Sequence, residues 1–119
     1  MDRNQLGKDA EQHALQFLIT KGLSPLTQNY RCRTGEIDLI MKENSTLVFV
    51  EVRLRQNRLY GSAADSVTSR KQQKIIRAAR YFLSGQPALQ NLECRFDVIA
   101  YDGTEALAAP LWYKDAFRL

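Results

Sequence analysis

Two apolar stretches separated by a short polar turn constrain the fold of this 119-residue chain most strongly. Residues 36–42 and 46–54 are rich in Ile, Leu, Val and Phe, which is typical of buried strands. A turn centred on Asn44-Ser45 pairs residues whose numbers sum to 89. This register predicts a β-hairpin with one wholly apolar face, because a slip by one residue would mix polar and apolar side chains. That face would carry Ile37, Leu39 and Met41 opposite Val48, Val50 and Val52.

The same register places two carboxylates together on the other face of the hairpin. Asp38 is expected opposite Glu51, and Glu36 opposite Arg53. The β-carbons of such pairs lie roughly 4.5–5.5 Å apart, and like charges at that distance repel. A hard divalent cation, Mg²⁺ or Mn²⁺, would offset the repulsion, because it binds carboxylate oxygens, water and substrate phosphate. The alternatives are a purely structural pair neutralised by Arg53 or Arg55, or protonation of one carboxyl.

Helical and strand patterns flank the hairpin on both sides. The expected elements are a helix over 3–21, strands over 28–33, 36–42 and 46–54, a loop over 55–67, a helix from a Thr68 or Ser69 cap to Ser84, and a strand over 93–101. After Asp102 the pattern is weak, and Trp112 and Phe117 are expected to fold back as a cover. The order predicts an α/β fold, a mixed sheet with helices packed on it.

Composition bounds the class of protein. The chain length suits a single domain, 1–119. No apolar run approaches the roughly 18 residues of a membrane span, and Met1–Lys8 carries no signal peptide, so we expect a cytoplasmic protein. Cys32 and Cys94 stand outside any CxxC spacing and are predicted to be reduced. His13 is the single histidine, so a zinc site is not expected.

Positive charge is concentrated in residues 51–80, which hold eight Arg and Lys residues against Glu51 and Asp65. Such a local excess is typical of a polyanion-binding surface, although an ordinary solvated surface has the same composition. The residues suited to phosphate contacts include a helical edge formed by Arg70, Lys74 and Arg77.

Two further acids are ambiguous from the residues alone. Glu11 shares a helical stripe with Gly7, Ala14 and Leu18, whose small members permit close approach to the sheet. It could therefore point toward the carboxylate pair, or be a boundary glutamate. Glu36 could be a third acid of the site or the ion-pair partner of Arg53. In contrast, Arg95 and Asp97 share one strand face, which favours a structural role.

A set of short motifs runs in order along nearly the whole chain. They are Gly7 and Glu11, Asn29-Tyr30-Arg31, Gly35-Glu36-Ile37-Asp38-Leu39-Ile40, Phe49-Val50-Glu51-Val52-Arg53 with Arg55, Tyr60-Gly61, Lys71, and Arg95-Phe96-Asp97-Val98. Together they resemble the YraN family of uncharacterised bacterial proteins, which is similar to archaeal Holliday-junction resolvases and to the PD-(D/E)xK nuclease superfamily. The resemblance implies a restriction-endonuclease-like αβββαβ core with a mixed β-sheet flanked by helices.

The resemblance also implies a site and a departure from it. It assigns Asp38 and Glu51 as metal ligands and Glu11 as the helical acid of the same site. Arg53 stands where the superfamily usually has lysine. An arginine keeps the positive charge but is effectively never deprotonated, so Arg53 could stabilise the transition state and could not act as a general base.

Three functions from different classes follow. The first is a Mg²⁺- or Mn²⁺-dependent endonuclease, a hydrolase acting on duplex or branched DNA, with Glu11, Asp38, Glu51 and Arg53 as catalytic residues; a branched substrate would suit a homodimer. In it, the DNA backbone is held by Arg55, Arg70, Lys71 and Lys74. The second is a nucleic-acid-binding module that kept the fold and has weak or no catalysis. The third is a structural protein whose carboxylates belong only to an ion-pair network.

Overall fold

A computed structural model describes residues 3–55, 63–102 and 110–118. The elements are α1 (Arg3–Thr20), β1 (Ser24–Cys32), β2 (Gly35–Glu43), β3 (Thr46–Arg55), a 3₁₀ turn η2 (Ala64–Ser66), α2 (Ser69–Ser84), a 3₁₀ turn η3 (Pro87–Leu89), β4 (Glu93–Asp102) and β5 (Leu111–Phe117). The five strands form one sheet in the order β1-β2-β3-β4-β5, in which only β3 and β4 are parallel. The expected αβββαβ order and mixed sheet are therefore confirmed, with β5 added at the end.

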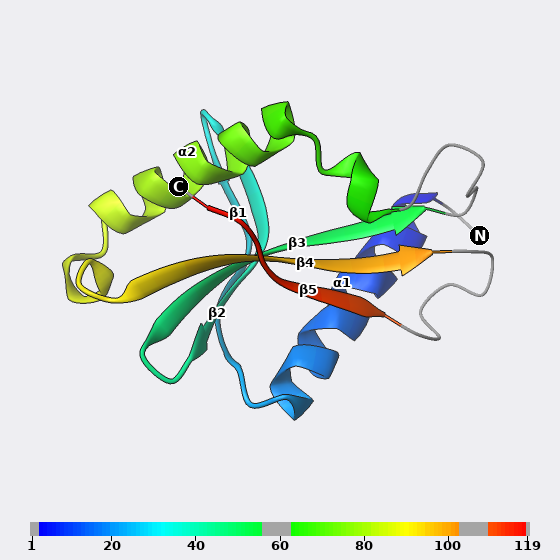
Figure 1. The fold of residues 1–119 in the computed structure, drawn as a ribbon, viewed down its shortest axis with the longest axis horizontal. Coiled ribbons are helices and arrows are strands. Elements are labelled where there is room, and N and C mark those ends of the chain that lie inside the picture. The colour runs from blue at the N-terminus through cyan, green and yellow to red at the C-terminus, as the bar shows by residue number, and fades with distance from the viewer. Residues whose placement is uncertain (1–2, 56–62, 103–109, 119) are drawn as a thin grey trace.

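The two helices cover opposite faces of the sheet (Figure 1). The side chains of β3 divide between them: Leu47 and Phe49 pack with α2, whereas Val48 and Val50 pack with α1. Because successive side chains of a strand point to opposite faces, a strand covered on both sides must be apolar throughout. The uninterrupted apolar run of β3 thus follows from its central place in the sheet.

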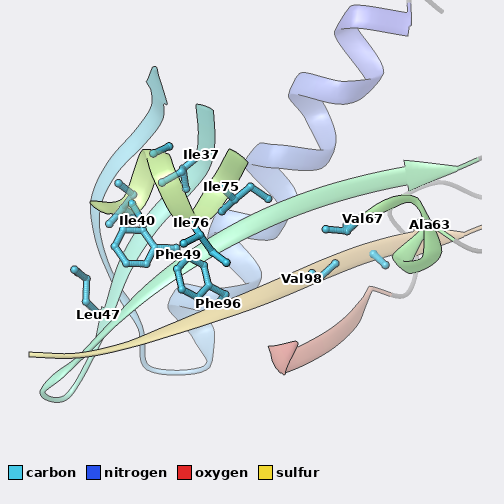
Figure 2. Packing of buried hydrophobic residues seen from close by; sticks show 13 residues of the cluster. Ile37, Ile40, Leu47, Phe49, Ala63, Val67, Ile75, Ile76, Phe96 and Val98 are labelled. Atoms are coloured by element: carbon cyan, nitrogen blue, oxygen red, sulfur yellow. The ribbon is translucent and has the colours of Figure 1, made fainter. Parts of the chain in front are cut away.

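The core beneath α2 holds that helix against the sheet (Figure 2). Ile75 and Ile76 of α2 are buried against Phe49 and Phe96, whose rings stack with centroids 5.3 Å apart. The helix begins as expected at Thr68, whose hydroxyl accepts a hydrogen bond from the backbone N–H of Lys71. This packing fixes the first turn of α2 next to the ends of β2 and β3.

The predicted hairpin register is confirmed over most of its length. Strands β2 and β3 pair from Leu39 with Val50 to Glu43 with Thr46, and each pair of numbers sums to 89. At the turn, Asn44 takes the left-handed conformation that this residue type tolerates, with φ of 55°. The turn centred on Asn44-Ser45 therefore sets which side chains face one another.

The pairing of β2 with β3 ends at Leu39 and Val50, while β2 stays paired with β1 as far as Gly35. From Leu39 toward Gly35, β2 and its partner β1 diverge from β3, so the sheet forks (Figure 1). Three expectations are wrong as a result. Asp38 is not paired with Glu51 in the ladder, and Glu36 lies opposite Arg31 and not Arg53. Ile37 packs in the α2-side cluster rather than with Leu39. The ladder that would have imposed these arrangements has ended.

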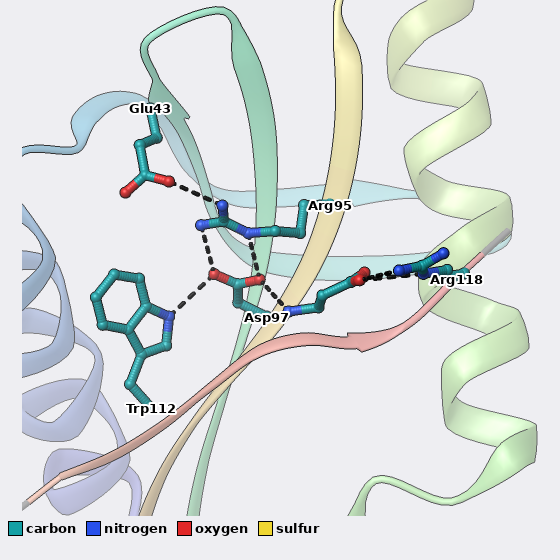
Figure 3. A network of polar contacts seen from close by, with 6 residues as sticks. Glu43, Arg95, Asp97, Trp112 and Arg118 are labelled. Atoms are coloured by element: carbon teal, nitrogen blue, oxygen red, sulfur yellow. Dashed lines mark hydrogen bonds and ion pairs between the residues drawn. The ribbon is translucent and has the colours of Figure 1, made fainter.

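The edge of the sheet next to β4 is formed by a strand that sequence patterns did not predict. Residues Leu111–Phe117 pair with β4 as β5, where only a folded-back cover was expected. Asp97 of β4 is fully buried and holds β5 by accepting hydrogen bonds from the Trp112 side chain and the Asp115 backbone N–H, each at 2.9 Å. Arg95 binds the same carboxylate, as a structural role predicted (Figure 3).

Within the described residues, neither helix is long and apolar enough to span a membrane.

Candidate active site

Asp38 lies where β2 leaves β3, at the base of the fork. Its Oδ2 accepts a hydrogen bond of 2.8 Å from the backbone N–H of Val52 on β3. The carboxylate thus takes a place that a backbone carbonyl would fill in a continuing ladder. This contact anchors the half-buried Asp38 side chain and orients it toward the adjacent residue on β3, Glu51.

Glu51 brings a second carboxyl to the same place. Its pKa is raised far above the usual range, first by burial, then by a hydrogen bond with the Asp38 side chain, and then by the negative charge of Asp38. The sequence therefore predicted correctly that these two carboxyls meet. They meet through their side chains across the fork, and not as a backbone-paired position of the ladder.

Glu11 brings a third carboxyl from α1. The pKa of Glu11 is raised to about 7, first by burial and then by the negative charges of Asp38 and Glu36. The charge of Arg31 and a hydrogen bond with Asn29 act in the opposite direction and lower this pKa. The charge effect of Asp38 places Glu11 near the pair, which is the inward of the two orientations that its helical stripe allowed. Three acidic side chains from three elements therefore share one region.

Arg53 is held beside these carboxyls. Its Nε donates a hydrogen bond of 2.8 Å to Oγ of Ser66, which is buried in η2 and in turn donates to the Ala63 carbonyl at 2.5 Å. The positive charge of Arg53 lowers the pKa of Glu51, but only partly offsets burial and the effect of Asp38. The guanidinium is thus fixed next to the pair and has not neutralised it.

The predicted phosphate-binding residues come from the end of β3 and the start of α2. Arg55 ends β3 and is half-buried, whereas Arg70, Lys71 and Lys74 are exposed in the first two turns of α2. Burial lowers the pKa of Lys71, as does the charge of Arg53, while the charge of Glu51 raises it. Lys71 therefore lies close enough to Glu51 for the two charges to interact. Arg58, Tyr60 and Gly61 lie outside the described residues.

Glu36 has a different partner from the one expected. It is directly opposite Arg31 in the β1–β2 ladder and forms an ion pair with it, Nε to Oε2, at 3.2 Å. Both side chains are largely exposed, so the pair contributes little to stability. Glu36 nevertheless lies close enough to the site for its charge to raise the pKa values of Glu11 and Glu51.

The donor set suits a hard divalent cation with few protein ligands. Over the described ranges, no group of three or more His, Cys, Asp and Glu side chains is arranged as a complete metal-binding cluster. Mg²⁺ is commonly bound by only one or two carboxylates, together with waters and substrate phosphate. Asp38 and Glu51 supply such a pair, and a bound cation would take the place of the proton that the raised pKa of Glu51 keeps beside Asp38.

Three residues of the region escaped the reasoning from residue pattern. Asn29 contacts Glu11, Arg31 pairs with Glu36, and Ser66 holds Arg53. Asn29 and Arg31 carry a signal in hindsight, because both belong to the short motif that precedes the hairpin. A small polar residue such as Ser66 in an expected loop has no comparable signal.

Comparison with known proteins relates the chain to one family. A model of the uncharacterised protein family UPF0102 matches residues 10–101. A UPF0102 protein of Saccharophagus degradans is 50% identical over 116 residues, covering 98% of this chain and 95% of the relative. Another, of Pseudomonas syringae, is also 50% identical over 116 residues, covering 97% and 94%. A third, of Nitrosococcus oceani, is 43% identical over 113 residues, covering 95% and 91%. These names state a family and no activity.

Proposed function

The chain belongs to the uncharacterised protein family UPF0102, the YraN family that its motifs indicated, and we propose that it is a metal-dependent endonuclease that hydrolyses DNA phosphodiester bonds. The observation that carries this proposal is the contact of Asp38 and Glu51 at the fork of the sheet, with Glu11 nearby. The confirmed αβββαβ order, which the nuclease resemblance implied, supports it.

Asp38 and Glu51 would hold the Mg²⁺ or Mn²⁺ ion, with Asp38 oriented by the N–H of Val52. A bound ion of this kind polarises the phosphodiester and lowers the pKa of an attacking water. Glu11, whose pKa of about 7 lets it exchange a proton near neutrality, assists from α1. Arg53 stabilises negative charge at the phosphate, and Ser66 fixes its position.

The DNA backbone would be held by the basic residues beside the fork, namely Arg55, Arg70, Lys71 and Lys74. Phosphate contacts of this kind position a substrate without reading its sequence. A branched DNA presents two strands for cleavage, which would suit a homodimer with two sites. The mass of the protein in solution, measured by light scattering with and without four-way DNA, tests the dimer.

Cleavage of duplex, forked and four-way DNA with Mg²⁺ or Mn²⁺ tests the activity. We expect metal-dependent nicking that Asp38→Ala lowers at least about 100-fold, because the substitution removes a metal ligand. Glu93→Ala is the matched control, since Glu93 is an exposed acid at the start of β4, and it should cut like the wild type. Equal cutting by wild type and Asp38→Ala would show a contaminating nuclease and end the proposal.

A second candidate is a nucleic-acid-binding module with weak or no catalysis on the same fold. It is favoured by Arg53, whose guanidinium stands where a lysine is usual and is tied to Ser66. This candidate predicts salt-sensitive DNA binding and no cleavage with either metal. Arg53→Lys separates the two: a rise in cleavage would show that the arginine limits catalysis, and no cleavage in either protein favours the binding module.

A further inference from the structure

The turn between β1 and β2 carries positive charge that lies outside the basic segment 51–80. Arg31 lies at the end of β1, Arg33 lies in the turn itself, and Lys74 of α2 lies beside them. Together with Cys32, Thr34, Gly35 and Glu36 they line an open pocket of about 370 Å³. The pocket therefore joins three cations and one acid from parts of the chain that are far apart in sequence.

The β1–β2 hairpin packs closely against α2 at this pocket. Gly35 has a φ of 154°, and a β-carbon added to it would lie 3.1 Å from the carbonyl oxygen of Lys74. A larger residue would be strained in that conformation, and the Lys74 carbonyl would have to shift to admit it. Nearby, the rings of Tyr30 and Phe82 meet edge to face with centroids 5.2 Å apart. These contacts hold Arg31 and Arg33 next to Lys74.

The cations of the pocket have charge available for a ligand. Among the described residues, neither Arg33 nor Lys74 forms an ion pair, and both are exposed. Arg31 pairs with Glu36, but both side chains are largely exposed, and exposed pairs exchange partners at little cost. A concave surface with such an excess of Arg and Lys favours an anion, and guanidinium groups bind phosphate oxygens in two-point contacts.

The pocket adjoins the carboxyl site. Glu36 lines the pocket and lies two residues before Asp38 on β2. The same strand therefore connects the pocket to the carboxyl site. A DNA strand carries a phosphate at every nucleotide, roughly 3.4 Å apart along the helix axis, so one lying at the fork presents further phosphates to both sides.

We propose that Arg31, Arg33 and Lys74 form a subsite for a backbone phosphate of DNA, next to the phosphate that lies at Asp38 and Glu51. This inference rests on the proposed function, which supplies the strand. It adds the β1–β2 turn to the binding surface.

Fluorescence anisotropy with labelled duplex DNA in EDTA tests the subsite without cleavage. We expect Arg33→Gln and Lys74→Gln each to weaken binding several-fold and to reduce the slope of log K against log salt by about 1. The matched control is Lys42→Gln, which removes a positive charge from the other end of β2, about 20 Å away by strand rise. The control should bind like the wild type, and circular dichroism melts verify that all variants fold.

The outcomes separate the subsite from the nuclease. Equal losses in Lys42→Gln and the pocket variants would overturn the subsite and leave the nuclease standing. Selective losses without cleavage by the wild type would support the subsite and count against the nuclease. A wild type that binds no DNA would overturn both.

A second arm uses inorganic phosphate against chloride at equal ionic strength, since free phosphate offers the same oxygens. Stronger displacement by phosphate than by chloride, lost in the Arg33→Gln, Lys74→Gln double variant, supports a subsite that DNA phosphate occupies. Equal displacement of DNA by the two salts, the same in the wild type and the double variant, would overturn the proposal.

Discussion

Two groups of acidic side chains in the same sheet differ in how their charge is satisfied. On β4, the buried Asp97 accepts hydrogen bonds from Arg95, from Trp112 and from the backbone of Asp115, at 2.9–3.0 Å. At the fork, Glu51 is half-buried and lies against another carboxyl, which raises its pKa. Asp97 is thus surrounded by hydrogen-bond donors, whereas Glu51 lies against the carboxyl of Asp38.

The difference separates a structural acid from acids suited to a ligand. A buried charge is tolerated when hydrogen bonds and an opposite charge surround it, and the Asp97 group meets both conditions. The Asp38 and Glu51 pair meets neither in full, because Arg53 is tied to Ser66 and only partly offsets burial and the charge of Asp38. A divalent cation would supply the missing positive charge, so the contrast supports the metal site proposed at the fork.

The largest effect expected is from Asp97→Ala. It should lower the free energy of unfolding by about 3–5 kcal/mol, because it leaves the guanidinium of Arg95 without its main partner and releases β5. Urea unfolding followed by circular dichroism measures this. The control Glu93→Ala, an exposed acid on the same strand, should change stability by less than about 0.5 kcal/mol. A similar small change in both variants would erase the contrast between the two acidic groups.

The fold could be predicted where local patterns determine it. The register of β2 and β3 followed from a short turn and an apolar face, and α2 followed from its period and its Thr68 cap. Strand β5 could not be predicted, because its side chains are mostly exposed and show no alternation. It is held instead by distant contacts to Asp97 and by the left-handed φ of 53° at Asp115, which local sequence does not specify.

The meeting of the two carboxyls was predictable to the same extent as the register. Asp38 and Glu51 were brought together by counting through the turn, and the structure places them in contact. The partner of Glu36 was predicted wrongly, because the count assumed a ladder that ends at Leu39. Tertiary packing decides where two strands separate, here the packing of Gly35 against α2. The periodicity of the strand sequence does not indicate this position.

An effect of opposite sign is expected from Glu51→Gln. At pH 8 it should raise the stability of the metal-free protein, on the order of 1–2 kcal/mol, because an amide avoids the cost of burying a second acid. It should also remove the stabilisation that we expect Mn²⁺ to give the wild type, since a ligand stabilises only the state that binds it. Thermal melts with and without Mn²⁺ measure both. Destabilisation of the metal-free protein would mean that the pair is structural, like Asp97.

The pH dependence of the metal-free wild type tests the same point. The pKa values of Glu11, at about 7, and of Glu51 lie above the ordinary 4.5, so the folded protein holds more protons than the unfolded chain above pH 4.5. Stability is therefore greatest below that pH and falls as pH rises through about 7. Melts across pH 4.5–8 should show this fall, and Mn²⁺ should reduce it at the upper end. A rise with pH would contradict the assignment.

The smallest effect expected is from Glu36→Gln. This variant tests whether Glu36 is only the ion-pair partner of Arg31 or a third acid of the metal site. If Glu36 only pairs with Arg31, its removal frees that guanidinium and takes a negative charge from the path of the DNA, so affinity should tighten about two- to three-fold at low salt, as expected of an exposed pair. Stabilisation by Mn²⁺ should then stay unchanged, because Asp38 and Glu51 still hold the ion. If Glu36 is instead a third acid of the metal site, the Mn²⁺ effect weakens. Anisotropy in EDTA and melts with Mn²⁺, made on one preparation, distinguish the two because only the second responds to a lost ligand.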